Sequence, residues 1–272
     1  MPTKEEVRAA NIKMHTVLGD NYDKEPHYKP ENIKRVSRIL EGLQQQTMGD
    51  SLLDIGCGRG FIIDIARKYF KTIRGIDITP AMLKKVRTRS KTCDINVVEC
   101  PSDAIVFPDN YFDVCTAYAL LHHLDEIEGT LKEAYRVLKG GGVLYTDLDP
   151  NYYFWGALNN LPEGEYSPII NREIKSVVGD VFEVADGVDK ETLILAENLK
   201  YKQGGFAAGE LKIAVERAGF KECTINYNWF LGEGSVTHGE AKKSIEHFQK
   251  YMQDILPLSR PLFKYLSIVA VK

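Results

Sequence analysis

The residues best suited to chemistry lie where short apolar runs end. The segment LLDIGCGRG at residues 52–60 passes from an apolar run into a turn in which glycines alternate with other residues. Glycine lets the backbone take positive φ angles and approach a ligand closely. A strand that enters such a turn before a helix is a common nucleotide-binding arrangement of α/β folds. The spacing is not the G-x-G-x-x-G of dinucleotide sites, because Phe61 stands where the third glycine would be.

Acidic side chains follow the next two apolar runs. Asp77 ends the run 72–77, where a carboxylate can accept hydrogen bonds from both hydroxyls of a ribose. Asp103 follows the run 95–99 and can accept a hydrogen bond from the exocyclic amine of an adenine. Each acid alone also suits an ordinary turn or helix cap. Their order along the chain after the glycine turn favours the ligand-binding interpretation.

Two histidines and a third acid follow later apolar runs. His122 and His123 come after the run 113–118, and Asp147 ends the run 143–147. An imidazole with an ordinary pKa near ~6.5 can accept a hydroxyl proton at neutral pH. The alternative for the histidines is simple packing at the start of a helix. We take His122, His123 and Asp147 as candidate catalytic residues, either as bases or as groups that orient a substrate.

Strand-like and helix-like patterns alternate between residues 49 and 148. The expected strands are 51–55, 72–77, 95–99, 113–118 and 143–147, and the expected helices are 30–46, 61–70, 80–89 and 128–138. The alternation returns with a helix at 209–218, a strand at 221–229, a helix at 240–255 and a strand at 265–271. This order predicts an α/β fold with a doubly wound, mostly parallel sheet.

The same pattern divides the chain into four segments. We expect an N-terminal lid and helix at 1–48, a ligand-binding core at 49–148, an inserted cap at 149–205, and completion of the sheet at 206–272. The last segment would hold a second insertion at 231–262. Residues 152–155 are aromatic and could pack within the cap or line a pocket.

Composition restricts the partners. Lys and Arg number 35 and Asp and Glu 38, which argues against a non-specific nucleic-acid binder. The five cysteines form no C-x-x-C pair, so disulfides and a cysteine-only metal site are not expected, and a reducing compartment fits. The polar N-terminus and the lack of a long apolar run predict neither a signal peptide nor a membrane span. We expect a cytoplasmic protein that acts on a small molecule; a homodimer is compatible with the sequence.

In sequence order these features resemble the class I S-adenosylmethionine-dependent methyltransferases, especially the small-molecule branch that includes ubiquinone, menaquinone and sugar methyltransferases. The motifs that carry the resemblance are LLDIGCGRG (52–60), Asp77, SDA (102–104), LLHHL (120–124) and AYRVLKGGGVL (134–144). The resemblance covers residues 51–148 closely and 206–271 more loosely. It implies a seven-stranded sheet whose last strand, here 265–271, is inserted antiparallel.

The resemblance also implies residue roles. The implied cofactor contacts are Asp54, Gly56, Cys57, Gly58 and Gly60 for the methionine part, Asp77 for the ribose, Ile78, Met82, Ser102, Asp103 and Ala104 for the adenine, Ala117 and Tyr118 beside the sulfonium, and Tyr22 in a lid. The implied activity is transfer of a methyl group from S-adenosyl-L-methionine, which leaves S-adenosyl-L-homocysteine.

We expect the acceptor to be a hydroxyl oxygen of a small molecule, methylated by in-line displacement. Alignment of well-oriented reactants can supply roughly 7–11 kcal/mol, so a base matters only when the acceptor must lose a proton. The alternatives are N- or C-methylation, a nicotinamide-dependent oxidoreductase, and a non-catalytic protein that binds S-adenosylmethionine. A protein or RNA methyltransferase fits less well, since the chain has neither a basic excess nor a D/N-P-P-Y/F motif after the fourth strand.

Overall fold

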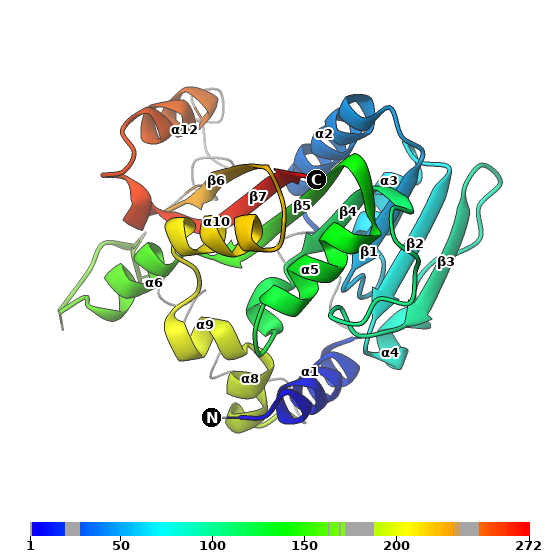
Figure 1. Cartoon of the computed structure of the whole chain (residues 1–272). Coiled ribbons are helices and arrows are strands. Elements are labelled where there is room, and N and C mark those ends of the chain that lie inside the picture. The colour runs from blue at the N-terminus through cyan, green and yellow to red at the C-terminus, as the bar shows by residue number, and fades with distance from the viewer. Residues whose placement is uncertain are drawn as a thin grey trace.

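The computed structural model describes residues 2–19, 28–162, 164–168, 170–171, 188–231, 233 and 245–272. Its centre is a seven-stranded sheet in the order β3-β2-β1-β4-β5-β7-β6 (Figure 1). The strands are β1 (Ser51–Ile55), β2 (Thr72–Asp77), β3 (Asp94–Glu99), β4 (Phe112–Tyr118), β5 (Leu138–Pro150), β6 (Glu222–Phe230) and β7 (Phe263–Val271).

Helices cover both faces of this sheet. They are α1 (Lys4–Leu18), α2 (Pro30–Thr47), α3 (Phe61–Ala66), α4 (Pro80–Leu83), α5 (Glu128–Val137), α6 (Tyr152–Asn159), α8 (Lys190–Ala196), α9 (Asn198–Gln203), α10 (Ala208–Arg217) and α12 (Ile245–Asp254), with the short 3₁₀ turns η3 (Leu121–His123) and η6 (Arg260–Leu262). Within the described ranges, no helix combines the length and the apolar character needed to cross a membrane.

The predicted topology is confirmed. Strand β1 pairs in parallel with β2 and β4, β2 with β3, and β4 with β5. Strand β7 pairs antiparallel with both β5 and β6 and so lies between them. The final strand is therefore inserted antiparallel, as the sequence resemblance implied.

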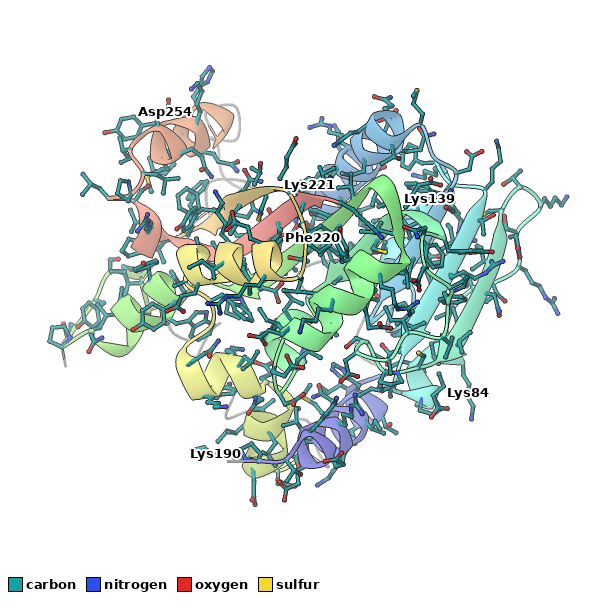
Figure 2. The ribbon with its side chains drawn as sticks, viewed as in Figure 1. Lys84, Lys139, Lys190, Phe220, Lys221 and Asp254 are labelled. Carbon is teal, nitrogen blue, oxygen red and sulfur yellow. The ribbon has the colours of Figure 1, made fainter. Side chains whose placement is uncertain are left out.

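The two sides of the sheet form separate apolar cores because neighbouring strand residues point to opposite faces. Leu53 and Ile55 of β1 belong to the core beneath α5 and α10, whereas Leu52 belongs to the core beneath α2 and α3. On the first face Phe220, labelled in Figure 2, packs edge-on against Tyr135 of α5 with 5.3 Å between ring centroids. Among the described residues, both faces are thus packed with apolar side chains.

The structure differs from the sequence prediction in several elements. Residues 4–18, for which no separate helix was predicted, form one, and its start is fixed by a capping box between Thr3 and Glu6. Helices α3 and α4 end at Ala66 and Leu83, earlier than predicted. For α4 the reason is visible, since residues 87–90 are exposed and offer no apolar face to bury.

A buried polar network holds α2 against the carboxyl ends of β4 and β5. Arg35 pairs with Asp147 at 2.6 Å, and the Asp147 side chain is fully buried. The hydroxyl of Tyr145 donates to the same carboxylate, and Asn32 donates to the hydroxyl of Tyr118 at 2.8 Å. The Arg35 guanidinium compensates the charge of Asp147, so this pair ties the helix to the sheet.

Replacing Arg35 should therefore destabilise the fold. Loss of one partner from a buried ion pair lowers the free energy of unfolding by about 3–5 kcal/mol. Because the Arg35 side chain is 30% exposed, we expect a loss at the lower end of that range. We expect Arg35→Met to lower the free energy of unfolding in urea by about 3 kcal/mol. The control is Arg87→Met, because the Arg87 side chain is 75% exposed in its pair with Asp64 and such pairs contribute about 1 kcal/mol or less. Equal losses in both variants would contradict this role.

Candidate active site

A cavity opens where the parallel strands end. Helix α1 lies at this end of the sheet (Figure 1). Its lining residues come from α1, the glycine turn, and the segments after β2, β3 and β4: Val7, Arg8, Asn11, His15, Gly56, Gly58, Asp77, Ile78, Thr79, Met82, Cys100, Pro101, Ser102, Asp103, Tyr118, Ala119, Leu120, His123, Leu124, Asp125, Glu126 and Thr130. The space, including its open mouth, is about 840 Å³.

The glycine turn is shaped by its neighbours. Gly56 has φ +69°, and a Cβ atom there would lie 2.6 Å from Leu120 Cδ1. The backbone N–H of Cys57 donates to the carbonyl of Ile76 at 2.9 Å, which fastens the turn to the end of β2. The requirement for glycine at this position is therefore both conformational and steric.

Asp77 lies at the cavity beside this turn. Its Oδ2 accepts from the N–H of Gly58 at 2.9 Å, and its Oδ1 accepts from the N–H of Thr79 at 2.8 Å. An ionised carboxylate offers about four acceptor positions, so two remain for ligand hydroxyls. The two backbone contacts fix the orientation in which those positions are presented.

Asp103 lines the opposite part of the cavity and is paired with α1. Its two carboxylate oxygens contact Lys4 and Arg8, and its side chain is only 11% exposed. Burial raises the pKa of Asp103, but the Lys4 hydrogen bond and the two cations outweigh it and hold that pKa below the ordinary value. Asp103 is thus an anion at the cavity wall, and both of its oxygens are paired with cations of α1.

Asp54 and Cys57 are buried beneath the turn. Asp54 is 1% exposed and accepts a hydrogen bond from the Thr116 hydroxyl at 2.8 Å. Burial raises the pKa of Asp54 to about 7 despite that hydrogen bond. Burial also raises the pKa of the Cys57 thiol, which makes it a poor nucleophile and favours a packing role.

The two adjacent histidines differ in placement. His123 lines the cavity, and its Nδ1 lies 2.8 Å from the carbonyl of Ala196. A carbonyl only accepts, so Nδ1 carries the proton and Nε2 is the basic nitrogen. His122 does not line the cavity; its Nδ1 lies 3.1 Å from Asp149 Oδ1. Burial lowers the pKa of His122 to about 4 and that of His123 to about 3, so both imidazoles are neutral at physiological pH.

Helix α1 contributes four cavity residues that the sequence analysis missed: Val7, Arg8, Asn11 and His15. His15 lies edge-on to His123 with 5.2 Å between ring centroids, and burial lowers its pKa to about 4. Asn11 donates from Nδ2 to the carbonyl of His123 at 3.0 Å. The helical spacing of Val7, Ala10 and Met14 after the capping box was the available signal for this wall.

The structure thus separates the predicted site residues into three groups. Those that line the cavity are Gly56, Gly58, Asp77, Ile78, Met82, Ser102, Asp103, Tyr118 and His123. Those outside its lining are Asp54, Cys57, Gly60, Ala104, Ala117, His122 and Asp147. Tyr22 lies outside the described residues.

The prediction of a catalytic Asp147 needs correction. Both of its oxygens are engaged, Oδ1 by the N–H of Leu148 and the amide of Asn228, and Oδ2 by Arg35 and Tyr145. The carboxylate of Asp147 is therefore occupied by the contact with Arg35 of α2, which stabilises the fold. Within the described ranges, no cluster of three or more His, Cys, Asp or Glu side chains could hold a metal ion.

Comparison with known proteins identifies the central segment. Residues 53–146 match the protein family described as a methyltransferase domain. The 27-O-demethylrifamycin SV methyltransferase of Amycolatopsis mediterranei is 34% identical over 45% of this chain and 47% of its own length. The ubiquinone biosynthesis O-methyltransferase of Coxiella burnetii is 25% identical over 51% of this chain and 64% of its own length. The chain therefore spans about half to two-thirds of these relatives.

A solved structure agrees at the level of the fold. The S-adenosylmethionine dependent methyltransferase from Mesorhizobium loti superposes with a TM-score of 0.55 and 18% identity, covering 86% of this chain and 96% of that one. Residues 53–146 thus match the methyltransferase domain family, and the chain shares the fold of the Mesorhizobium loti protein.

Proposed function

We propose that this chain is a methyltransferase that transfers a methyl group from S-adenosylmethionine to a hydroxyl oxygen of a small molecule. The observation that carries the proposal is the shared cavity, which brings Asp77, Asp103 and His123 together beside the glycine turn. The names of the two relatives above, one of them an O-methyltransferase, support the same class of reaction.

The residues present fit the proposed methyl donor. The carboxylate of Asp77 keeps two acceptor positions for the ribose hydroxyls, and Asp103 offers an anion to the adenine amine. Met82 is buried at the same wall and supplies an apolar surface for a planar ring. When bound, S-adenosylmethionine would supply a methyl group already activated by its positively charged sulfur.

The chain's own task is then to hold the acceptor and take its proton. His123 suits the second role because its Nδ1 is committed to Ala196 and its Nε2 is the basic nitrogen. A neutral imidazole can accept a hydroxyl proton, whereas a protonated one cannot. Helix α1 lies across the cavity and would limit the access of water during transfer.

Removing the Asp77 carboxylate should weaken binding of the product S-adenosylhomocysteine. Each hydrogen bond to a charged acceptor contributes about 1.5–3 kcal/mol, so we expect Asp77→Ala to raise the Kd by roughly 10- to 150-fold. Isothermal titration measures this directly. Asp94→Ala is the control, since Asp94 begins β3 at the amino ends of the parallel strands, away from the cavity, and its side chain is 70% exposed. An unchanged Kd for Asp77→Ala would contradict the ribose role, and tighter binding of NADH than of S-adenosylhomocysteine would favour an oxidoreductase.

The two histidines should respond differently to substitution. We expect His123→Gln to lower kcat by roughly 10²–10⁴-fold with a hydroxyl acceptor, because a general base acts in the transition state. His122→Gln should have a smaller effect, since His122 does not line the cavity. The measurement is transfer of labelled methyl to a panel of phenols, sugar hydroxyls and amines. A loss below about threefold for both variants would leave alignment as the whole mechanism.

A further inference from the structure

Helix α1 and helix α8 of the predicted cap share an apolar interior of their own. Figure 1 shows the two helices side by side. Their buried apolar contact is separate from the two cores of the sheet and consists of Ala10, Met14, Val188 and Ala196. Lys13 adds a 2.6 Å ion pair with Asp189, the residue before α8 and 176 positions later in the chain. Because apolar packing resists separation in water, we expect the two helices to keep their relative position.

Charged and polar contacts join this pair of helices to the rest of the cavity wall. Lys4 and Arg8 each contact one oxygen of the Asp103 carboxylate. The two cationic side chains are 37% and 33% exposed, so water and salt reach them. Asn11 donates from Nδ2 to the carbonyl of His123 at 3.0 Å. These contacts hold α1 over the cavity, and the two ion pairs with Asp103 are the part that ionic strength weakens.

The junction between α8 and α9 offers a place where the pair can turn. Glu197 separates the two helices with φ −103° and ψ 47°, outside the helical range. After it, Leu199 is buried in the main core of the sheet, and Asn198 donates to the carbonyl of Leu124 at 3.0 Å. Helix α9 is therefore fixed to the sheet, whereas α8 packs on α1. Hinges are a few residues of this kind between two packed bodies.

We propose that α1 and α8 form one lid over the cofactor cavity and that the ion pairs of Lys4 and Arg8 with Asp103 are a latch that sets the rate of cofactor exchange. The inference rests on the proposed function, since it takes S-adenosylmethionine and its product as the ligands of the cavity. A carboxylate offers about four acceptor positions, so the latch and an adenine amine can share Asp103. Opening the latch then speeds both entry and exit of the cofactor and changes its affinity little.

The consequence for the enzyme is that one movement serves both sides of the reaction. Helix α1 lines the cofactor cavity, and α8 belongs to the predicted cap. A lid that contains both helices exposes the cofactor cavity and displaces part of the cap in the same step. Lid opening limits the turnover of many enzymes, so the strength of the latch would limit the release of product.

Surface plasmon resonance with S-adenosylhomocysteine measures the exchange rates in the full chain. We expect Lys4→Met combined with Arg8→Met to raise the association and dissociation rate constants roughly tenfold each, with a change in Kd below about threefold. Lys13→Met is the matched control, because Lys13 pairs with Asp189 inside the lid and its side chain is 50% exposed; neither rate should change. Lys4→Arg combined with Arg8→Lys keeps both cations and should exchange at the rates of the unsubstituted chain. Unchanged rates in the Met double variant, or an equal increase in Lys13→Met, would overturn the latch.

Salt separates the latch from other effects of these substitutions. Raising the NaCl concentration from roughly 0.1 M to roughly 1 M screens partly exposed ion pairs, so it should speed dissociation of S-adenosylhomocysteine from the unsubstituted chain about threefold or more. The Met double variant has no latch to screen, and its dissociation rate should stay nearly constant. The same salt dependence in both chains would contradict the proposal.

Pulsed electron paramagnetic resonance tests the lid without any ligand. Spin labels at the exposed positions Ala9→Cys and Ile194→Cys report the distance between α1 and α8, and labels at Ala9→Cys and Asn96→Cys report the distance between α1 and β3. The background carries Cys223→Ser, because the other four native cysteines are buried.

Adding the Met double substitution should broaden the α1–β3 distances and leave the α1–α8 distances unchanged. Broadening of both would show that α1 moves alone, and broadening of neither would show that no latch exists; each result overturns the proposal. If the distances respond as expected but S-adenosylhomocysteine does not bind, the proposed function fails and the lid stands.

Discussion

The hydrogen bonds on the turn after β4 are the constraint on which the site depends. The backbone and side chain of His123 bond to both α1 and the α8–α9 junction, and the carbonyl of Leu124 accepts from Asn198. Segments more than seventy residues away on either side of this turn therefore meet at one point. Without these bonds the sheet would still bound one side of the cavity, but α1 would not be held on the other side.

Burial and charge divide the strand ends into two environments. On the cavity side Asp77 and Asp103 are acceptors held by backbone or cationic groups. On the α2 side Asp147 is neutralised by Arg35 and serves stability. The same type of residue at the ends of different strands thus has different surroundings. Asp77 and Asp103 line the cavity, and Asp103 also pairs with cations of α1, whereas Asp147 lies outside the cavity lining and pairs with Arg35.

The sequence predicted the sheet and the cofactor side of the cavity because both follow from local patterns. The run before Gly56 and the run ending at Asp77 are short, apolar and bounded by turn residues, and parallel strands bring their ends to one edge. The other features of the site depended on contacts between distant parts of the chain. The surroundings of Asp147 depended on Arg35 of α2, and the hydrogen bond of His123 depended on Ala196, in a segment whose contacts no periodic pattern in the sequence revealed.

The place of β7 has a consequence for the order of assembly. Strand β6 precedes it in the chain but bonds to the described sheet only through β7, so β6 has no partner until β7 pairs with β5. That pairing joins Leu144 to Ala270, a contact between distant parts of the chain, and contacts of this kind form slowly. We therefore expect the edge of β5 to stay open late in folding, when an unpaired strand can associate with another chain. The protein would then be most prone to aggregate while its cofactor half is already formed.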